Sequence, residues 1–344
     1  MMIDRNDLER LKRLLAPGGQ RIAVVAHTNP DGDAIGSALA WRRLLAGMGH
    51  EVCCAVPNRY PAFLGWMTDI GHLRIFREDT DGEVARFIAE ADLIFCLDFN
   101  QIERLEGMSA AIAANTRARR VLIDHHLNPP AIYDLQFSVP AASSTSFLVY
   151  GLIVALAGEK AVDYATAESL YVGMMTDTGN FSFSNLTPEL YRAVAVLAER
   201  GIDIPAIHNN VYNSFSEGRI RLLGYALNRK MEIMHPYGAA YISLTERDLR
   251  RFRFQIGDSE GFVNFPLAIR EVSMSAMFLE TKNFIRVSLR SRGDVDVNVF
   301  ARRYFDGGGH RNAAGGKSFL PMPETVERFR AAVEEFFGER SGAE

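Results

Sequence analysis

Short apolar runs alternate with longer helical patterns along the first half of the chain. Four runs rich in Val, Ile, Leu and Phe have the length of buried strands, namely 21–26 (RIAVVA), 51–56 (EVCCAV), 91–97 (ADLIFCL) and 120–123 (RVLI). Helical spacing of apolar residues is clearest over 34–48, and it returns over 143–157 and 163–175. This alternation predicts a parallel sheet covered by helices, which is an α/β domain.

The second half of the chain has a different rhythm. Strand-like runs over 239–244, 272–279 and 284–291 are separated by helical stretches, and 323–338 has the pattern of a strong amphipathic helix. A length of 344 residues favours two domains. We therefore predict a parallel-sheet domain over 1–187, a helical linker over 188–216, and a smaller α+β domain with a mixed sheet over 217–344.

Composition narrows the class of protein. With 48% hydrophobic and 23% charged residues, the sequence is that of a globular protein, and a net charge of −4 excludes a protein that coats nucleic acid by charge alone. The longest apolar stretch, 147–157, is about half of what a bilayer span needs. Few cysteines and the absence of a signal-like segment complete the expectation of a cytoplasmic protein without membrane contact.

Acidic and histidine side chains follow the predicted strands where they end. If the strands are parallel and adjacent, these side chains meet at one edge of the sheet, where open α/β sheets bind ligands. A mixture of carboxylates and imidazoles suits Mn²⁺, with Mg²⁺ as second choice, and two such ions serve phosphoester hydrolysis. The six candidate metal ligands are His27, Asp31, Asp33, Asp98, His125 and Asp177.

Each of these motifs alone has a structural explanation. Asp31 and Asp33 are typical of a turn that caps a helix, Asp98 could cap a turn after a strand, and Asp177 could end a helix. Crowded carboxylates, however, raise one another's pKa and require a cation to stay ionised together. The joint placement of the motifs at strand ends favours a metal site.

The motifs resemble those of the DHH phosphoesterase family. The segments that carry the resemblance are 27–37 (HTNPDGDAIGS), 97–98 (LD), 123–126 (IDHH) and 175–183 (MTDTGNFSF), followed by 307–316 (GGGHRNAAGG), which resembles the signature of the DHHA1 domain. The length resembles the branch of small nucleotidases called NrnA, which are nanoRNases that also convert pAp to AMP. The second motif departs slightly from the family pattern, because Asn100 and Gln101 stand where a second acidic residue is frequent.

The resemblance implies a role for each residue. His27, Asp31 and Asp98 would hold one Mn²⁺, and Asp33, Asp98, His125 and Asp177 would hold the other, so that Asp98 bridges the two ions. His126 would face the substrate phosphate as donor or acid, which makes His126 and Asp98 the candidate catalytic residues. Arg104 matches an arginine that is frequent in the family, and a nucleotide contact and a solvated helix residue stay open as interpretations.

Substrate contacts are expected from the second domain. The segment 281–317 contains eight Lys or Arg residues and three Asp residues, a basic island in an acidic protein. Polar residues alternate over 286–290, so Ser288 and Arg290 are expected on one face of a strand, together with Arg286. Gly307 to Gly309 are expected to form a loop with bare backbone amides that can wrap a phosphate. The candidate substrate-binding residues are Ser288, Arg290, Gly308, Gly309 and His310.

These features predict a hydrolase of short oligoribonucleotides and pAp. Linear dinucleotides such as pApA and polyphosphate are alternative substrates, because the chemistry is the same. A nucleotide sensor without activity and a family II pyrophosphatase rank lower, since all six candidate ligands and the glycine segment are present. The sequence leaves the oligomeric state open, a homodimer included.

Overall fold

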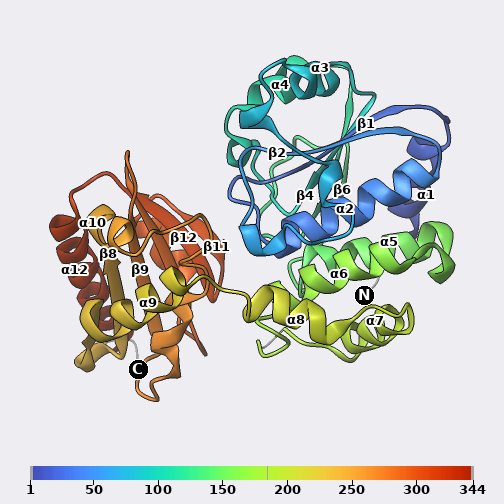
Figure 1. Cartoon of the computed structure of the whole chain (residues 1–344). Coiled ribbons are helices and arrows are strands. Elements are labelled where there is room, and N and C mark those ends of the chain that lie inside the picture. The colour runs from blue at the N-terminus through green and yellow to red at the C-terminus, as the bar shows by residue number, and fades with distance from the viewer. Residues whose placement is uncertain (1–2, 184, 342–344) are drawn as a thin grey trace. The chain divides into compact units, whose positions relative to one another are not determined.

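The computed structural model describes residues 3–183 and 185–341, and the chain divides into two compact units between Ser214 and Phe215. Each unit is built around its own six-stranded sheet (Figure 1). The predicted fold class, a parallel-sheet domain followed by a mixed-sheet domain, is confirmed. The domain limits given above stay predictions.

The first unit contains a fully parallel sheet in the order β3-β2-β1-β4-β5-β6. Chain order reverses between β1 and β4, as in doubly wound folds, whose ligands bind at this point of the sheet. The two outer strands were missed because they are short. The strands are β1 (Arg21–Ala26), β2 (Glu51–Val56), β3 (Leu73–Ile75), β4 (Leu93–Leu97), β5 (Arg119–Asp124) and β6 (Leu135–Ser138).

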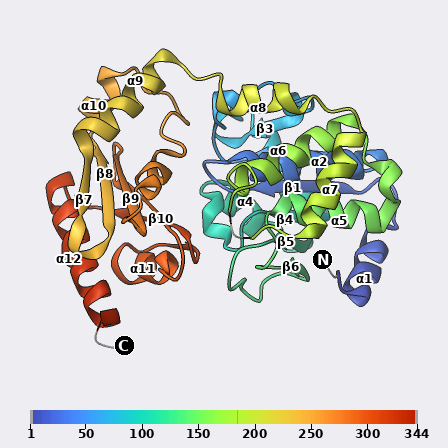
Figure 2. The ribbon, with the colours of Figure 1, turned by 90° about the horizontal axis from the view of Figure 1, so that it is seen from below.

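Helices cover both faces of this sheet, as Figures 1 and 2 show. On one face α3 (Glu83–Glu90) and α4 (Met108–Ala114) bury a small core. The other face carries the larger core, to which α1 (Arg5–Leu15), α2 (Gly32–Gly47), α5 (Thr145–Ala157) and α6 (Tyr164–Asp177) contribute. The parallel strands are therefore apolar on both sides, which explains their continuous hydrophobic runs.

The segment 188–216 was predicted as a helical linker. It contains α7 (Pro188–Glu199) and α8 (Ile204–Tyr212), which start at N-cap residues Thr187 and Asp203. Leu190 and Val211 lie within the core that α2 and α6 share. These two helices thus belong to the compact body of the first unit, and the chain passes into the second unit between Ser214 and Phe215.

The second unit has a mixed sheet in the order β11-β12-β10-β9-β8-β7, in which only β8 and β9 are parallel. A phenylalanine-rich core fills one face and a smaller cluster covers part of the other. The strands are β7 (Met231–Met234), β8 (Ala239–Leu244), β9 (Met274–Glu280), β10 (Ile285–Ser291), β11 (Gly308–His310) and β12 (Ala313–Ser318). The helices are α9 (Glu217–Tyr225), α10 (Glu246–Arg251), α11 (Val297–Tyr304) and α12 (Met322–Ser341).

Hydropathy along the helices bears on membrane contact. Within residues 3–183 and 185–341, every helix is too short or too polar to cross a bilayer.

Candidate metal centre and substrate face

The candidate metal ligands lie at the carboxyl ends of β1, β4 and β5 and at the end of α6. His27 follows β1 and Asp98 follows β4, and these strands are neighbours through the pair Ala26 and Leu97. Asp98 has a φ of 62°, which is rare for a residue with a side chain, and its N–H donates to Ile123 O. The strained backbone turns the Asp98 side chain at the reversal point of the sheet.

The six side chains form two groups of donor atoms. One nitrogen or oxygen atom each from His27, Asp31 and Asp98 lie within 4.8 Å of one another. The same holds for Asp33, His125 and Asp177. Asp98 reaches toward both groups.

The distances around Asp98 show this reach. Its Oδ2 lies 3.4 Å from His27 Nε2, and its Oδ1 lies 3.5 Å from His125 Nε2. The structure thus brings together all six side chains in the two sets that the motifs indicated, with Asp98 between them. Their roles as ligands stay a prediction.

Two histidines are oriented by backbone carbonyls. His27 Nδ1 lies 2.8 Å from Thr28 O, and His125 Nδ1 lies 3.2 Å from Ala142 O. A ring that donates from Nδ1 to a carbonyl keeps its Nε2 lone pair for another partner, which is the usual arrangement of metal-binding histidines. In both rings Nε2 faces carboxylate oxygens, so a proton or a cation must lie between them.

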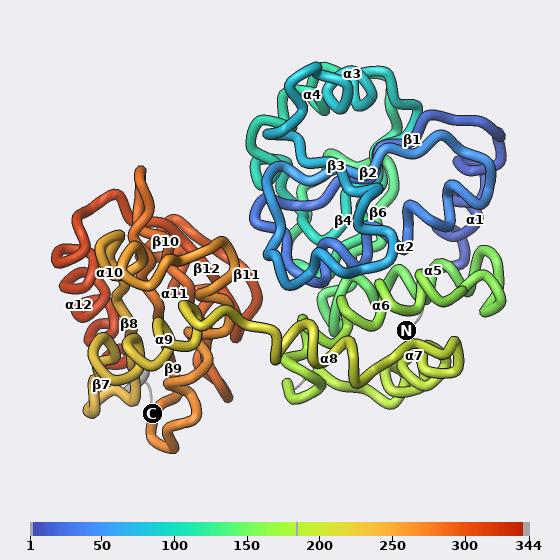
Figure 3. Tube along the Cα trace, viewed as in Figure 1, coloured from blue at the N-terminus to red at the C-terminus, as the bar shows by residue number. Residues whose placement is uncertain are grey.

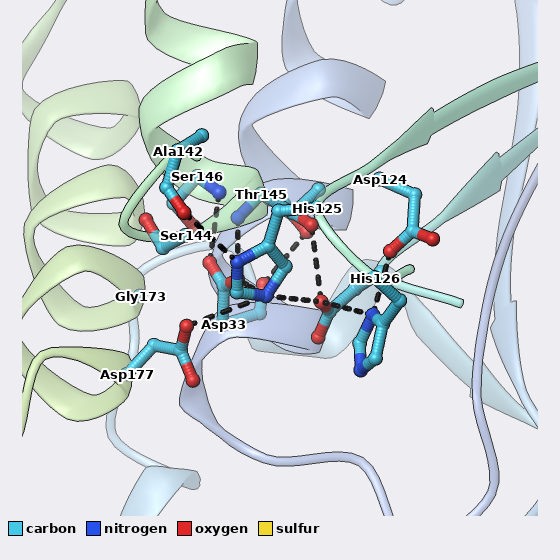
Figure 4. A network of polar contacts seen from close by, with 12 residues as sticks. Asp33, Asp124, His125, His126, Ala142, Ser144, Thr145, Ser146, Gly173 and Asp177 are labelled. Carbon is cyan, nitrogen blue, oxygen red and sulfur yellow. Dashed lines mark hydrogen bonds and ion pairs between the residues drawn. The ribbon is translucent and has the colours of Figure 1, made fainter. Parts of the chain in front are cut away.

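The start of helix α5 anchors Asp33. The Thr145 N–H donates to Asp33 Oδ2 at 2.6 Å, and the Ser146 N–H donates to Asp33 Oδ1 at 2.8 Å (Figure 4). The Thr145 hydroxyl also donates to Asp98 Oδ1 at 3.0 Å. Unsatisfied amides and the positive end of a helix favour a carboxylate there. Sequence reasoning missed Thr145 and Ser146, since they are 112 and 113 positions away from Asp33.

Glycines allow helices α2, α5 and α6 to approach closely enough for these contacts. A Cβ atom on Gly36 would lie 2.2 Å from Ser169 O. A Cβ atom on Gly173 would lie 1.9 Å from Ser146 Oγ and 2.8 Å from Asp33 Oδ1. Since real Cβ atoms do not approach other atoms this closely, any side chain here would push the helices apart. The close contact places Asp177, at the end of α6, beside Asp33.

The loop that contains Asp31 is fixed by its own polar groups. Asp31 Oδ1 accepts from the N–H groups of Asp33 and Ala34, so Asp31 does cap α2, as its structural explanation required. Asn58 Oδ1 accepts from the Thr28 hydroxyl and from the Asn29 N–H. Asp31 Oδ2 belongs to neither cap hydrogen bond, so capping and metal binding are compatible.

The pKa values of the buried residues indicate whether the cluster fits a cation. Burial and the nearby Asp98 and Asp177 carboxylates raise the pKa of Asp33 well above its ordinary value. Burial opposes ionisation of Asp98 too, yet hydrogen bonds from His125 and His27 hold its pKa well below the usual range. Although burial favours the neutral ring, the Asp177 and Asp98 carboxylates raise the pKa of His125 well above its ordinary value. The protein alone therefore balances these charges by taking up protons, and the donor set fits divalent cations.

His126 lies beside the cluster between two further residues. Its Nδ1 is 2.7 Å from Asp124 Oδ1, and its Nε2 is 3.3 Å from Arg104 Nη1. Asp124 is fully buried. Asp124 was part of the quoted motif but not among the candidate site residues. The sequence signal that could have identified Asp124 is its position two residues before His126, at the end of a predicted strand.

In the second unit, four of the candidate substrate residues share a sheet face. Ser288 and Arg290 alternate with buried residues of β10, as predicted. Register places Ser288 opposite Gly315 and Arg290 opposite Ala313, and Gly308 and His310 lie opposite the same two residues from β11. Because directly opposed residues point to one face, His310, Arg290 and Ser288 lie on the same side as Gly308. Because Gly308, Ala313 and Gly315 have small side chains or none, few atoms project from this face of β11 and β12.

The glycine segment differs from the expected loop. Gly308 and Gly309 belong to strand β11, and the Gly309 N–H donates to Asn298 Oδ1 while the Gly307 N–H donates to Ala301 O. The prediction of bare amides was wrong. Glycine is required for close approach, because a Cβ atom on Gly307 would lie 1.9 Å from Gly315 O and one on Gly309 would lie 2.5 Å from Ala313 O.

The basic island is not one surface. Arg303 forms ion pairs with Glu335 and Glu339, and Arg311 pairs with Asp294. Arg286 is partly buried and donates to Ser259 Oγ. A count of charges along the segment therefore overstates the charge that a ligand can meet.

Comparison with known proteins shows one family over both units. The family model of the DHH family, N-terminal domain, matches residues 21–174, and that of the DHHA1 domain matches residues 249–339. The chain is 28% identical over 316 residues to the bifunctional oligoribonuclease and PAP phosphatase NrnA of Thermus thermophilus, covering 91% of this chain and 89% of that protein. The bifunctional oligoribonuclease and PAP phosphatase NrnA of Bacillus subtilis is 25% identical over 85% of this chain and 88% of its own length.

A solved structure extends this comparison to three dimensions. The crystal structure of an exopolyphosphatase-related protein from Bacteroides fragilis matches with a TM-score of 0.91 and 38% identity, covering 98% of each chain.

Proposed function

The chain belongs to the DHH phosphoesterase family, with a DHH domain followed by a DHHA1 domain, and from this we propose that it is a metal-dependent hydrolase of short nucleic acids. The reaction cleaves phosphodiester bonds of short oligoribonucleotides with release of nucleoside monophosphates, and it converts pAp to AMP. The two NrnA proteins, which are named as oligoribonucleases and PAP phosphatases and match over 85% to 91% of this chain, support this substrate class. A cytoplasmic location is part of the proposal.

One observation carries the proposal, namely the two groups of donor atoms that meet at Asp98. In it, His27, Asp31 and Asp98 hold one divalent cation, and Asp33, Asp98, His125 and Asp177 hold the other. The oxygen-rich donor set favours Mn²⁺, with Mg²⁺ as the alternative. When bound by these residues, two such ions would offset the charge of the phosphate and would lower the pKa of a water molecule, which is the chemistry that phosphoester hydrolysis near neutral pH requires.

His126 and its neighbours are proposed to meet the substrate phosphate. Asp124 holds Nδ1 of the ring, so the Nε2 edge, which Arg104 contacts, is the edge proposed to meet the phosphate. The Arg104 guanidinium next to this edge can donate to the same phosphate oxygens, which favours the nucleotide contact over the solvated interpretation. Buried Asp124 thereby acts as a positioning residue for His126.

The sheet face with Arg290, Ser288 and His310 is proposed to bind the rest of the substrate. Arg290 supplies charge, and Gly308, which has no side chain on this face, is proposed to admit a sugar-phosphate chain close to the strands; Gly309 lies opposite Ala314 and does not belong to this face. The proposed role of the glycine segment depends on its lack of side chains and not on the Gly309 amide, because that N–H already donates to Asn298 Oδ1. Binding energy gained at this face can position the scissile bond.

A panel of substrates tests the proposal. Purified protein with Mn²⁺, with Mg²⁺ and with EDTA is incubated with pAp, pApA, a five-nucleotide RNA and polyphosphate. We expect mononucleotide release from the RNA and AMP from pAp, strongest with Mn²⁺ and absent with EDTA. Release from none of the nucleotide substrates would contradict the proposal.

Polyphosphate is in the panel for a specific reason. The similar structure from Bacteroides fragilis is of a protein described as exopolyphosphatase-related. Phosphate release from polyphosphate alone would favour that activity, and release from pApA alone would favour a linear dinucleotide phosphodiesterase. Nucleotide binding without release would indicate a sensor.

A further inference from the structure

Two aromatic side chains lie at the end of the second sheet that is far from His310 in the strand register. Phe284 precedes β10 and Phe319 follows β12, and the pair Ile285 and Ser318 places them opposite each other. Their ring centroids are 6.3 Å apart at an angle of 58°. Phe319 is 75% exposed, the largest value for a large apolar side chain in the described part of the chain. An exposed phenylalanine beside a second ring is unusual enough to require an explanation.

Both rings stand on a fixed backbone. The Thr281 N–H donates to Phe284 O, and the Phe284 N–H donates to Thr281 Oγ1, which closes the turn between β9 and β10. On the other side, the buried hydroxyls of Ser318 and Thr325 are 2.8 Å apart, and Thr325 Oγ1 donates to Leu320 O. Phe319 is thus held between two anchored residues. A pre-ordered aromatic ring in water loses little entropy when a ligand covers it.

Positive charge accompanies the rings. Lys317 Nζ lies 4.9 Å from the centroid of the Phe284 ring, and Lys282 is exposed in the neighbouring turn. Aromatic rings next to cations are the elements with which proteins bind single-stranded nucleic acid, because bases stack on the rings and phosphates meet the charges. Unlike Arg303 and Arg311, neither lysine forms an ion pair with any residue of 3–183 or 185–341.

The strand register connects these rings to the face with the candidate substrate residues. Lys317 lies opposite Arg286 on β10 and β12, two residues along from the pair Ser288 and Gly315. Residues two apart on a strand point to the same side, so Lys317 continues the face that holds Ser288, Arg290 and His310. Figure 3 shows β10, β12 and β11 as neighbouring traces of the second unit.

We propose that Phe319 and Phe284, with Lys317, form a stacking site for a nucleobase of an oligonucleotide that extends along β10 and β12. The inference rests on the proposed function and adds a determinant of substrate length, because pAp is too short to occupy both ends of the face. A second copy of this chain fits the two rings less well than a nucleobase does. A two-fold contact on Phe319 would bring Lys282 and Lys317 of both copies together, and like charges oppose such a contact.

Substrate length gives the first test. We compare KM for a five-nucleotide RNA with KM for pAp in the wild type and in Phe319→Ala. Loss of one stacking contact is expected to raise the ratio of the two KM values about 5- to 20-fold. Phe319→Trp should return the ratio to the wild-type value or below it. Val299→Ala is the matched control, since Val299 is 49% exposed on α11, outside this face, and its ratio should not change.

Binding without turnover separates this inference from the proposed function. With EDTA present, fluorescence anisotropy of a labelled five-nucleotide RNA should show weaker binding to Phe319→Ala than to the wild type. The same sugar-phosphate chain without bases should bind both proteins equally. If the wild type binds the RNA but releases no nucleotide, the proposed activity is wrong, and this comparison still decides the role of Phe319.

The outcomes that overturn the inference are clear. Equal RNA affinity of wild type and Phe319→Ala would exclude the stacking site. So would a change in molecular mass by light scattering with an unchanged KM ratio, which would identify the rings as a contact between copies of the chain. Because Phe319 is mostly exposed, its truncation should leave the thermal unfolding midpoint unchanged, so a folding defect does not obscure the result.

Discussion

The two units handle charge in opposite ways. In the first, Asp33, Asp98 and His125 are almost fully buried, and each ionised group depends on a partner that the fold supplies. In the second, Arg290 lies opposite Ala313 and Lys317 lies opposite Arg286, on a sheet face to which β12 also contributes Gly315. Chemistry on a phosphate needs charges at fixed positions in a dry site, whereas binding of a variable chain needs an accessible surface. Changes in the first unit should therefore alter kcat, and changes in the second should alter KM.

The largest effect is expected from Asp98→Ala. Asp98 belongs to one donor group and lies 3.5 Å from His125 of the other, so its loss should lower kcat at least about 10³-fold on pAp and on RNA. The measurement is steady-state hydrolysis with Mn²⁺, and circular dichroism checks the fold. Asp294→Ala, with a side chain 88% exposed, is the control. An active Asp98→Ala enzyme would refute the bridging role.

Gly173→Ala tests whether close helix packing is needed for the buried site. Its Cβ atom would overlap Ser146 Oγ, which separates α6 from α5 and moves Asp33 and Asp177 apart. We expect a loss of about 1–3 kcal/mol in the free energy of unfolding and a fall in kcat of more than about tenfold. Urea unfolding and steady-state kinetics measure the two quantities.

A helical glycine with free space provides the matched control. Gly47 ends α2 and nothing lies within 4 Å of a Cβ atom there. Gly47→Ala should leave kcat unchanged and alter the free energy of unfolding by no more than about 1 kcal/mol. Equal behaviour of the two variants would show that the site tolerates helix separation.

Arg290→Ala tests the open face of the second unit. Removal of a charged hydrogen-bond donor should raise KM for a five-nucleotide RNA about tenfold, with kcat changed by less than about twofold. Arg250→Ala serves as control, because its side chain is 75% exposed on α10. A fall in kcat at unchanged KM would place Arg290 in the chemical step and remove the distinction between the units.

The smallest effect is expected at the ion pair between Lys230 and Asp248 in the second unit. Although burial opposes ionisation, hydrogen bonds from Lys230 and Thr245 lower the pKa of Asp248 to about 2. A lowered folded-state pKa stabilises the fold above the unfolded value of 3.8, and this contribution disappears as pH falls toward 2. Asp248→Asn should lose about 1 kcal/mol of unfolding free energy at pH 7.

The pH dependence provides the decisive comparison for Asp248. Unfolding midpoints of wild type and Asp248→Asn should differ at pH 7 and converge between pH 4 and pH 2. A difference that persists at pH 2 would mean that packing, not charge, explains the effect. The kcat for pAp should be the same in both proteins at pH 7.

Much of the first unit could be predicted because its signals are local. Buried parallel strands appear as continuous apolar runs, and the acidic or histidine residue at each strand end marks the edge of the sheet. The strands missed there, β3 and β6, have three and four residues and sit at the edges, where alternation is weak. In the second unit β7, a four-residue edge strand, was missed, and β11 and β12 were missed because glycine and alanine carry no strand signal.

By itself, the sequence determined the fold class, the two-domain organisation in outline, and the six side chains that meet at the sheet edge. Only the tertiary structure decided how that edge is held together: α5 presents its amides to Asp33, Gly173 admits the helix that carries Asp177, and Asp124 orients His126. It also decided that Gly307 to Gly309 serve strand contact and that part of the basic island is paired internally. Apart from the contact between Asp124 and His126, which are two positions apart, these contacts join residues that are not neighbours in the chain, such as Asp33 and Thr145, and local patterns contain no information on which of them form.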